Sequence, residues 1–357
     1  MLKLLLTYTF VFLVLFLSAK KDSSDVNSKL VIPVAYYTPE TKFSAGLGLM
    51  QVFKIKAKAF ENNQTHSSFL KAKALIAQTG QYNLESSLTM FTPGNRYFFE
   101  EDFEFSFVPL PFYGTGNLVN PSVFEYYSAN ILTQNAKCIK NIDGKWYIGL
   151  QQQYKDFELK ETLDGGIIQS GIVGSEGGVT SGLGWVIRRD TRDNVNASYK
   201  GAYLNIEWIR YDKILRSDFE FTNLRLDYRK FISLNSLIIA WQLRTDFNEG
   251  VVPFYKSAML GGDQFMRGYF RGQYRDHHFW MTQVELRKMF NPYLTLAGFI
   301  ATGNVFNQIN DWQWNYQKWS AGGGVRLTPP GTDRLCIRLD LSYGNQFYWY
   351  FTIGEAF

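Results

Sequence analysis

The sequence is poor in cysteine, histidine and charge. Its 357 residues include two cysteines and three histidines, and Asp, Glu, Lys and Arg together make up only 19%. Two cysteines cannot form a disulfide-rich scaffold. Apolar runs of about 18 residues, which transmembrane helices require, are also missing beyond the first 19 residues. These deficits exclude a small disulfide-stapled domain and a membrane protein built of many helices.

Basic residues are not concentrated either. The formal net charge is +5, and the Lys and Arg residues do not cluster as a nucleic-acid-binding face would require. We therefore expect no nucleic acid partner.

Aromatic residues, in contrast, are abundant. The chain contains 30 Phe, 22 Tyr and 9 Trp, which together make up 17% of it, and this content excludes disorder. The mean hydropathy is nevertheless only −0.19, because single polar residues separate the rings. The length alone would allow two or three soluble domains or one large β-domain.

The first 19 residues have the pattern of a secretory signal peptide. Lys3 precedes an uninterrupted apolar stretch that ends at the small residue Ala19, and this is the order that export signals follow. A single transmembrane anchor is the alternative, since the stretch is long enough. The sequence thus predicts a signal peptide at 1–19, a short periplasmic lead at 20–31 and one β-domain at 32–357.

Side chains alternate between apolar and polar along almost the whole chain. In 333–343, the odd-numbered residues from Leu335 to Tyr343 are apolar or aromatic, whereas Cys336, Arg338 and Asp340 lie between them. Such a period of two is typical of β-strands. It predicts about sixteen strands, near 33–38, 43–56, 68–78, 81–91, 95–108, 122–138, 144–158, 178–189, 199–212, 217–231, 234–247, 277–290, 293–303, 319–328, 333–343 and 346–355.

These strands favour a transmembrane antiparallel barrel over a soluble sandwich. Most are longer than the usual five or six residues, and a tilted strand needs about 9–11 residues to cross a bilayer. Compact turns such as 92–95 (TPGN), 291–292 (NP) and 328–331 (TPPG) alternate with long connections, as in outer-membrane barrels with short periplasmic turns. We therefore expect an all-β barrel in the bacterial outer membrane, with lipid on its apolar face.

The polar face of the predicted barrel carries charges of both signs. Alternation places these residues inside: Arg225, Asp227, Arg229, Arg244, Asp246, Glu285, Arg287, Arg338 and Asp340. Mixed charge suits a water-filled lumen and equally a lumen closed by a loop.

One segment interrupts the alternation. Residues 261–276 read GGDQFMRGYFRGQYRD and lie in the longest connection between strands. The glycines permit tight backbone turns, and Arg267 is a candidate to dock on an inward carboxylate. The segment is therefore either a solvated surface loop or a loop folded back into the lumen.

Here the sequence resembles a family. Gly261-Gly262 followed by Arg267-Gly268-Tyr269 is similar to the lumen-inserted loop of BamA/TamA-type outer-membrane barrels, the bacterial surface antigen superfamily. Three further segments carry the same resemblance, which extends over 31–357: 39–41 (PET), 190–194 (DTRDN) and the closing 350–357 (YFTIGEAF).

The resemblance implies partners for the loop arginine. In the family this arginine pairs with acidic residues on the following two strands, and the first of them corresponds to Glu285. The second falls in 299–304 (FIATGN), where the family commonly has Asp and this chain has Ala301. Glu285 is therefore the main expected partner of Arg267.

The resemblance also implies a lateral seam between the first and last strands. Pro33, which cannot donate a ladder hydrogen bond, and Gly354 weaken these two strands. The chain ends on Phe357, in the parity of Phe351 and Ile353, and such a terminal aromatic resembles the assembly signal of outer-membrane proteins. Family members usually carry periplasmic polypeptide-binding modules, for which 20–31 has no room, so the resemblance is to a module-less branch.

Three functions remain open on this basis. The first is the insertion or translocation of polypeptide, or of lipid, through the seam, with outer-membrane lipid, nascent outer-membrane polypeptides and a periplasmic protein as partners. The second is a passive or loop-gated channel. The third, a barrel lipase or protease, is disfavoured because the only histidines, His66, His277 and His278, lack a nucleophile motif. We expect no catalytic site, no metal and no cofactor.

Overall fold

A computed structural model describes residues 28–55 and 65–357. The expected signal peptide and most of the expected periplasmic lead lie outside the described residues. Within the described ones, no helix is long and apolar enough to cross a membrane.

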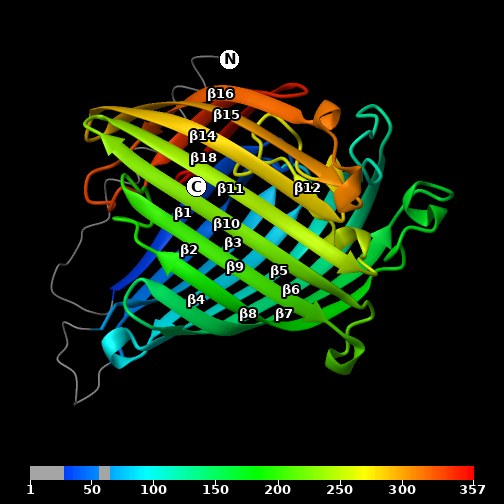
Figure 1. Ribbon diagram of the computed structural model, residues 1–357, viewed down its shortest axis with the longest axis horizontal. Coiled ribbons are helices and arrows are strands. Elements are labelled where there is room, and N and C mark those ends of the chain that lie inside the picture. Colours follow the sequence, from blue (N-terminus) through cyan, green and yellow to red (C-terminus); the bar gives the residue numbers. More distant parts are fainter. Residues whose placement is uncertain (1–27, 56–64) are drawn as a thin grey trace.

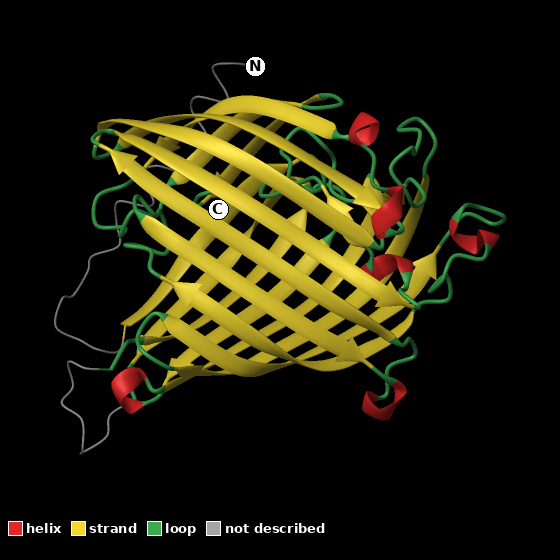
Figure 2. Ribbon diagram, viewed as in Figure 1, coloured by secondary structure: helices red, strands yellow, loops and turns green. Residues whose placement is uncertain are grey.

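Sixteen antiparallel strands close into one barrel (Figures 1 and 2). They are β1 (Ser28–Thr38), β2 (Lys42–Phe53), β3 (Ser68–Ala77), β4 (Tyr82–Phe91), β5 (Tyr97–Phe112), β6 (Glu125–Asn141), β7 (Trp146–Glu161), β8 (Gly178–Asp190), β9 (Gly201–Tyr211), β10 (Phe221–Leu234), β11 (Leu237–Gly250), β14 (His278–Asn291), β15 (Leu294–Phe306), β16 (Lys318–Leu327), β17 (Ile337–Tyr343) and β18 (Phe347–Ile353). Each of the sixteen strands predicted from alternation is present, so the predicted fold class is confirmed.

Within the connections that the structure describes lie two short strands and six short 3₁₀ helices. β12 (Ala258–Leu260) and β13 (Tyr274–Asp276) pair with each other and form a separate two-stranded sheet within the connection from β11 to β14. The helices are η1 (Pro93–Asn95), η2 (Ile168–Ser170), η3 (Lys213–Leu215), η4 (Phe254–Lys256), η5 (Ile309–Asp311) and η6 (Trp314–Tyr316).

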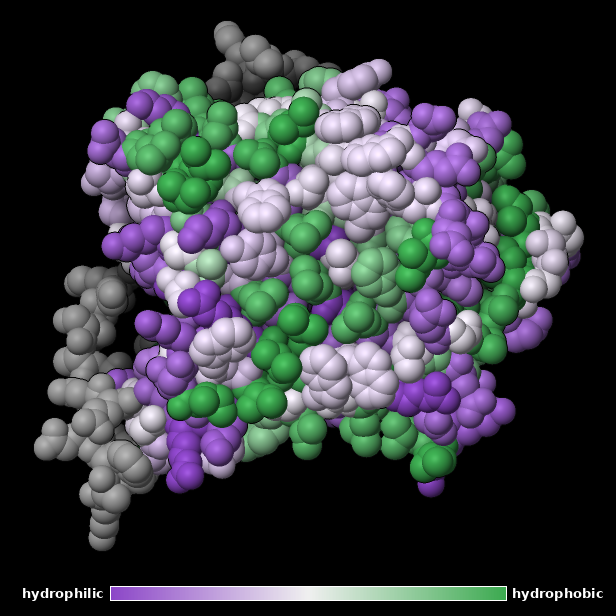
Figure 3. Space-filling view, viewed as in Figure 1, coloured by the Kyte–Doolittle hydropathy of each residue, from purple (hydrophilic) through white to green (hydrophobic). Residues whose placement is uncertain are grey.

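The two faces of each strand differ in polarity as alternation predicts. On β17, Leu339 and Leu341 are exposed at the outer surface, whereas Arg338 and Asp340 are buried inside the barrel. Green apolar and pale aromatic side chains cover much of the face seen in Figure 3. Such a surface suits lipid on the outside of a barrel.

The antiparallel order places the start of β1 and the end of β18 at the same end of the barrel, here called the terminal end. The opposite end is called the loop end. The compact turns 92–95, 291–292 and 328–331 all lie at the terminal end, and the long connections 113–124, 162–177, 251–277 and 307–317 lie at the loop end. The division has exceptions, because the loop-end connections 39–41, 78–81 and 344–346 are short and the terminal-end connection 54–67 is long.

The first strand is longer than alternation predicts, because β1 begins at Ser28 and pairs with β2 over its whole length. Leu30, Val31 and Ile32 are apolar in succession, so a period of two could not mark this start. Pro33 pairs with Leu47 of β2, and its missing N–H is tolerated because β1 is nearly unpaired on its other side.

Candidate functional site: a loop locked inside the barrel

The long connection 251–277 packs against the inner wall of the barrel. Its residues Leu260, Met266 and Tyr269 form one buried apolar cluster with Phe279 of β14 and Val305 of β15. Both strand residues have the inward parity of their strands, so the loop occupies part of the lumen. The alternative of a solvated surface loop does not describe this segment.

Arg267 is the most deeply held residue of this loop. Its Nη2 donates to Oε2 of Glu285 on β14 at 2.6 Å, and its Nη1 donates to Oδ2 of Asp340 on β17 at 2.5 Å. All three side chains are fully buried. The guanidinium also lies over the ring of Phe299, 3.4 Å from its centroid. Arg267 therefore ties the loop to two strands through charge-assisted hydrogen bonds, which are stronger than neutral ones.

The contact with Glu285 is the one expected from the sequence, whereas the contact with Asp340 was not foreseen. The family resemblance places a second carboxylate near Ala301 on β15, but Ala301 belongs to the apolar cluster under the loop. Alternation had placed Asp340 inside the barrel, but only closure of the sheet brings β17 close to the loop. The chain thus supplies the second acid from a different strand.

Arg326 on β16 joins the two carboxylates and was missed by sequence reasoning. It donates to Asp340, to Glu285 at 3.1 Å and to Glu355 at 3.2 Å. Gly324 makes room for it, because a Cβ at this position would lie 2.0 Å from Asp340 Oδ1 and 2.7 Å from Arg326 Nη1. The glycine run 322–324 was therefore the sequence signal for a crowded polar site behind β16.

Two further arginines complete what we call the ionic lock, defined as Arg267, Glu285, Arg287, Arg326, Arg338, Asp340, Asp263 and Glu355. Arg287 donates to Glu285 at 2.8 Å, and Arg338 donates to Asp263 at 2.9 Å. The lock contains four cations and four carboxylates, so its formal charges balance. Balance is required, because an unpaired buried charge costs several kcal/mol.

Backbone geometry holds the tip of the loop. Gly268 has a φ of 103°, and a Cβ there would lie 2.8 Å from the backbone N of Gly344. Its N–H donates to the hydroxyl of Tyr350, and the hydroxyl of Tyr269 donates to the carbonyl of Trp319 at 2.9 Å. Gly261 and Gly262 also have positive φ values, 106° and 97°. Only glycine adopts these conformations readily.

The turn 39–41, part of the family resemblance, also meets the loop. The backbone N–H of Arg271 donates to Oε1 of Glu40 at 2.8 Å. Burial raises the pKa of Glu40, although this hydrogen bond acts in the opposite direction. The loop is thus attached at its far side to the turn that joins β1 and β2.

Phe357 does not continue strand β18. β18 ends at Ile353, and Gly354 has a φ of 94°, which turns the chain away from the strand direction. Phe357 is therefore buried against Phe231 and Ala240 instead of continuing the outward row of Phe351 and Ile353. Arg287 donates to the carbonyl of Phe357 at 3.2 Å, so the last residues lie inside the barrel beside the ionic lock.

The seam between β1 and β18 is the shortest ladder of the barrel. It contains a single residue pair, Tyr37 opposite Phe351, whereas β1 and β2 pair from Ser28 to Thr38. Beside this pair the ring of Tyr37 stacks on that of Trp349, with centroids 3.6 Å apart. Among the described strands, residues 28–36 of β1 have a ladder partner on one side only.

The second segment of the resemblance, 190–194, lies at the terminal end and contacts a turn about 140 residues away. Arg334, between β16 and β17, donates to Asp193 at 2.7 Å, and Asn194 donates to Asp333 at 2.8 Å. The Arg334 guanidinium also lies over the ring of Tyr199. These contacts join the turn after β8 to the turn after β16.

This contact should depend on pH. Burial alone would raise the pKa of Asp193, but hydrogen bonds from Arg334 and from two backbone N–H groups hold it below its usual value. The stabilisation is therefore present above about pH 4 and is lost as the pH falls through the lowered pKa. Because Arg334 is one-third exposed, we expect only about 0.2–1 kcal/mol.

The measurement is proteolysis of the 191–200 turn as a function of pH. The wild type should become more sensitive below about pH 4, whereas Asp193→Asn should be equally sensitive throughout. Asp143→Asn, in another terminal-end turn, is the control and should behave as the wild type. Identical pH profiles for wild type and Asp193→Asn would contradict the assignment.

Neither the histidines nor the cysteines form a reactive cluster. Among the described residues, no group of three or more His, Cys, Asp or Glu side chains is arranged to hold a metal ion. Cys138 and Cys336 are free thiols. His278 is the first residue of β14, at the loop end, and His277 precedes it.

Comparison with known proteins agrees with this architecture. The Omp85 superfamily domain matches residues 178–357, half of the chain. The fold is similar to BamA from Haemophilus ducreyi lacking POTRA domains 1–3, with a TM-score of 0.62, 12% identity, and coverage of 92% of this chain and 70% of that one. It is also similar to CdiB from Escherichia coli, with a TM-score of 0.61, 10% identity and coverage of 94% and 64%.

CdiB from Acinetobacter baumannii gives a TM-score of 0.57 at 13% identity, with coverage of 92% and 59%. This chain thus spans about three fifths to two thirds of the CdiB chains. No curated protein matches the sequence. The matched domain contains β8 to β18 with the locked loop, the ionic lock and the closing segment, and the chain belongs to the Omp85 superfamily of outer-membrane β-barrels.

Proposed function

We propose that this barrel inserts or translocates polypeptide, or lipid, at the outer membrane through the lateral seam between β1 and β18. The observation that carries the proposal is the ladder of one residue pair between these strands. Every other neighbouring pair in the barrel has a ladder of at least seven pairs. The seam is therefore the place where the sheet opens with the fewest broken hydrogen bonds.

The unpaired edge of β1 is a surface to which a client strand could bind. Residues 28–36 pair with β2 on one side and leave backbone N–H and C=O groups on the other. Such groups are costly in lipid and form a template for an added strand. A client segment with β-propensity would satisfy them by β-augmentation.

The closing segment supports an opening at the terminal end. Beyond Gly354 the chain runs into the lumen, where Glu355 pairs with Arg326, so β18 does not continue alongside the first half of β1. We infer that this half of the seam faces the periplasm. A client delivered from that side, with or without a partner protein, would meet the free edge first.

The ionic lock would hold the resting state. Arg267 fixes the loop against β14 and β17, and Arg326 links the same carboxylates to the closing segment. Loop and seam are therefore attached to one buried network, and Glu40 adds a contact between the loop and the β1–β2 turn. We infer that the lock sets how readily the seam opens.

A loop-gated channel is the second candidate, because the lumen keeps charged side chains that are not fully buried. Arg225, Arg244 and Asp246 on β10 and β11 all retain some exposure. Water beside them would allow ions to pass once the loop moved. The direct test between the two functions is to close the seam covalently, which stops lateral insertion and leaves a pore intact.

A further inference from the structure

The connection between β15 and β16 has an unusual composition that the seam does not explain. Residues 307–317 read NQINDWQWNYQ, with six amide side chains, two Trp and one Tyr, and with Asp311 as the only charge. The segment contains the short helices η5 and η6 and lies at the loop end. Amides and exposed aromatic rings together are typical of surfaces that bind polar ligands with apolar faces.

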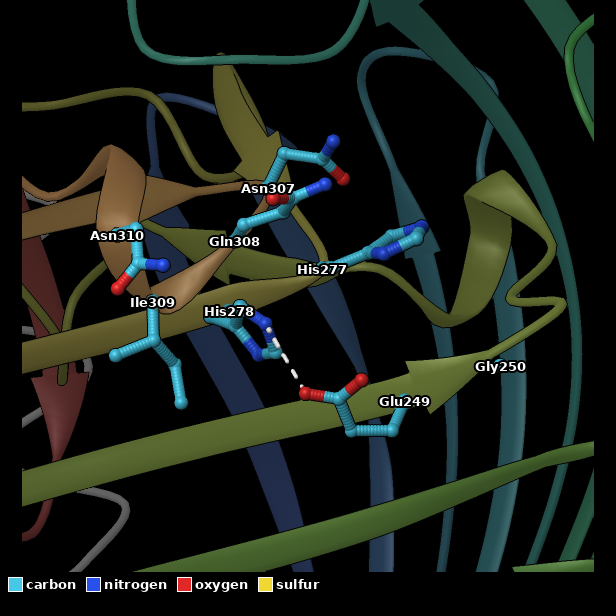
Figure 4. Close-up of a pocket in the computed structure, with 8 residues that line it drawn as sticks. All are labelled: Glu249, Gly250, His277, His278, Asn307, Gln308, Ile309 and Asn310. Carbon is cyan, nitrogen blue, oxygen red and sulfur yellow. Dashed lines mark ion pairs between the residues drawn. The ribbon is translucent and has the colours of Figure 1, made fainter.

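This connection forms one wall of a cavity of about 440 Å³. The other wall comes from Glu249 and Gly250 of β11 and from His277 and His278 (Figure 4). The volume lies within the range of about 300–1,000 Å³ that is usual for small-ligand pockets. Glu249 and His278 have the outward parity of their strands, so the cavity lies on the outer rim of the barrel and is separate from the ionic lock.

His278 is a buried polar group with a ring nitrogen left over. Its side chain is only 3% exposed, and Nε2 lies 3.6 Å from Oε1 of Glu249. Nδ1 is buried and has no hydrogen-bonding partner among the described residues. An unpaired buried polar atom costs free energy, so the wall of the cavity contains a ring nitrogen that a hydrogen bond from a ligand would stabilise.

Aromatic rings follow in the connection that forms this wall of the cavity. Trp314 is 67% exposed and packs edge-on against Trp312, with centroids 4.9 Å apart, and Trp312 lies near Trp280 of β14. Trp rings present a large apolar face and a single N–H donor. Such a face suits the C–H side of a pyranose ring.

The chemistry of the wall excludes other ligand classes. The His277 and His278 rings point in different directions (Figure 4), and their centroids are 6.4 Å apart, so they do not converge on a metal ion. The formal charge in the wall is the Glu249 carboxylate, which repels phosphate and other anions. The amide side chains can donate and accept hydrogen bonds and the Glu249 carboxylate can accept them, which matches neutral hydroxyl groups.

We propose that this rim cavity binds a neutral, hydroxyl-rich saccharide unit, with Trp314 against one face of the sugar ring and Asn310, Gln308 and Glu249 bonded to its hydroxyls. The sugar can come from the headgroup of a membrane glycolipid or from a free polysaccharide. The position on the outer rim at the loop end suits both sources.

The test uses the full barrel, refolded in detergent micelles and in nanodiscs. The probes are an array of neutral and of phosphorylated or sulfated oligosaccharides, and an uncharged diglycosyl diacylglycerol in nanodiscs. We expect the wild type to bind neutral glycans in preference to anionic ones, and Trp314→Ala and Asn310→Ala each to weaken binding at least tenfold. Binding of the soluble neutral oligosaccharides shows that a free glycan is sufficient, and binding only of the diglycosyl diacylglycerol in nanodiscs identifies a glycolipid.

Trp146→Ala is the matched control, since Trp146 is an exposed Trp at the terminal end of β7. It should bind glycans as the wild type does. Circular dichroism and heat-modified gel mobility establish that each variant is folded. The proposal is overturned if no glycan binds the folded wild type or if Trp314→Ala and Trp146→Ala bind glycan equally well. It is also overturned if nanodiscs without glycolipid bind the protein as well as nanodiscs with it.

Discussion

A disulfide between Tyr37→Cys and Phe351→Cys is expected to abolish the insertion of client barrels, and reduction is expected to restore it. These residues are the one pair of the β1–β18 ladder. Opposite residues in an antiparallel ladder have Cα atoms about 4.5–5.5 Å apart, within the range that a disulfide spans. A covalent bond at this position removes the opening that the proposed mechanism needs.

The measurement is insertion of an unfolded outer-membrane protein into proteoliposomes that contain this barrel, before and after reduction. The background carries Cys138→Ser and Cys336→Ser, because both native thiols are free. The reduced double variant controls for loss of the stacking between Tyr37 and Trp349. Activity should fall to the level of empty liposomes on oxidation alone.

A second cysteine pair tests whether position matters. Val325 and Leu339 are opposite each other in the β16–β17 ladder, on the outer face, and a disulfide between Val325→Cys and Leu339→Cys should leave insertion unchanged. Full insertion by the oxidised seam variant would refute the lateral seam. If the barrel inserts no client even when reduced, and if it still conducts ions with the seam disulfide formed, the channel function is favoured instead.

The fold could be predicted from the sequence because the membrane imposes a simple rule. Lipid outside and a polar interior force side chains to alternate, so even the long strands β5 to β7 are marked by their residues alone. The rule failed where both faces are apolar, at Leu30 to Ile32 of β1. It also failed at Gly354, where a backbone turn, invisible in the residue pattern, redirects Phe357 into the lumen.

The candidate site was only partly predictable for a related reason. Alternation states which face a residue occupies, and it therefore placed Glu285 and Asp340 inside. It does not state which inward residues meet, since β14 and β17 become neighbours of one loop only after the barrel closes. Arg326 was missed because its contact with Asp340 depends on the space that Gly324 leaves free. That space is a property of packing between two strands and is not visible in the sequence pattern.

Arg267→Ala is expected to release the loop from the lumen. Removing one partner of a buried ion pair costs about 3–5 kcal/mol, and lumen water cannot screen this pair because all three side chains are fully buried. The free-energy cost should lie near the lower end of this range, because Arg326 and Arg287 still neutralise part of the charge on Glu285 and Asp340. Arg267→Lys should restore little, because one ammonium group lacks the fork that bridges two carboxylates.

Two measurements report the release. Protease cleavage within 261–276 should rise by at least tenfold, and single-channel recordings in planar bilayers should change from small, flickering openings to larger ones. Arg271→Ala is the matched control: it lies four residues along the same loop, its side chain is exposed, and its contact with Glu40 uses only the backbone N–H. If Arg267→Ala is no more sensitive to protease than Arg271→Ala, the apolar cluster around Leu260 and Met266 holds the loop by itself, and the ionic lock does not control it.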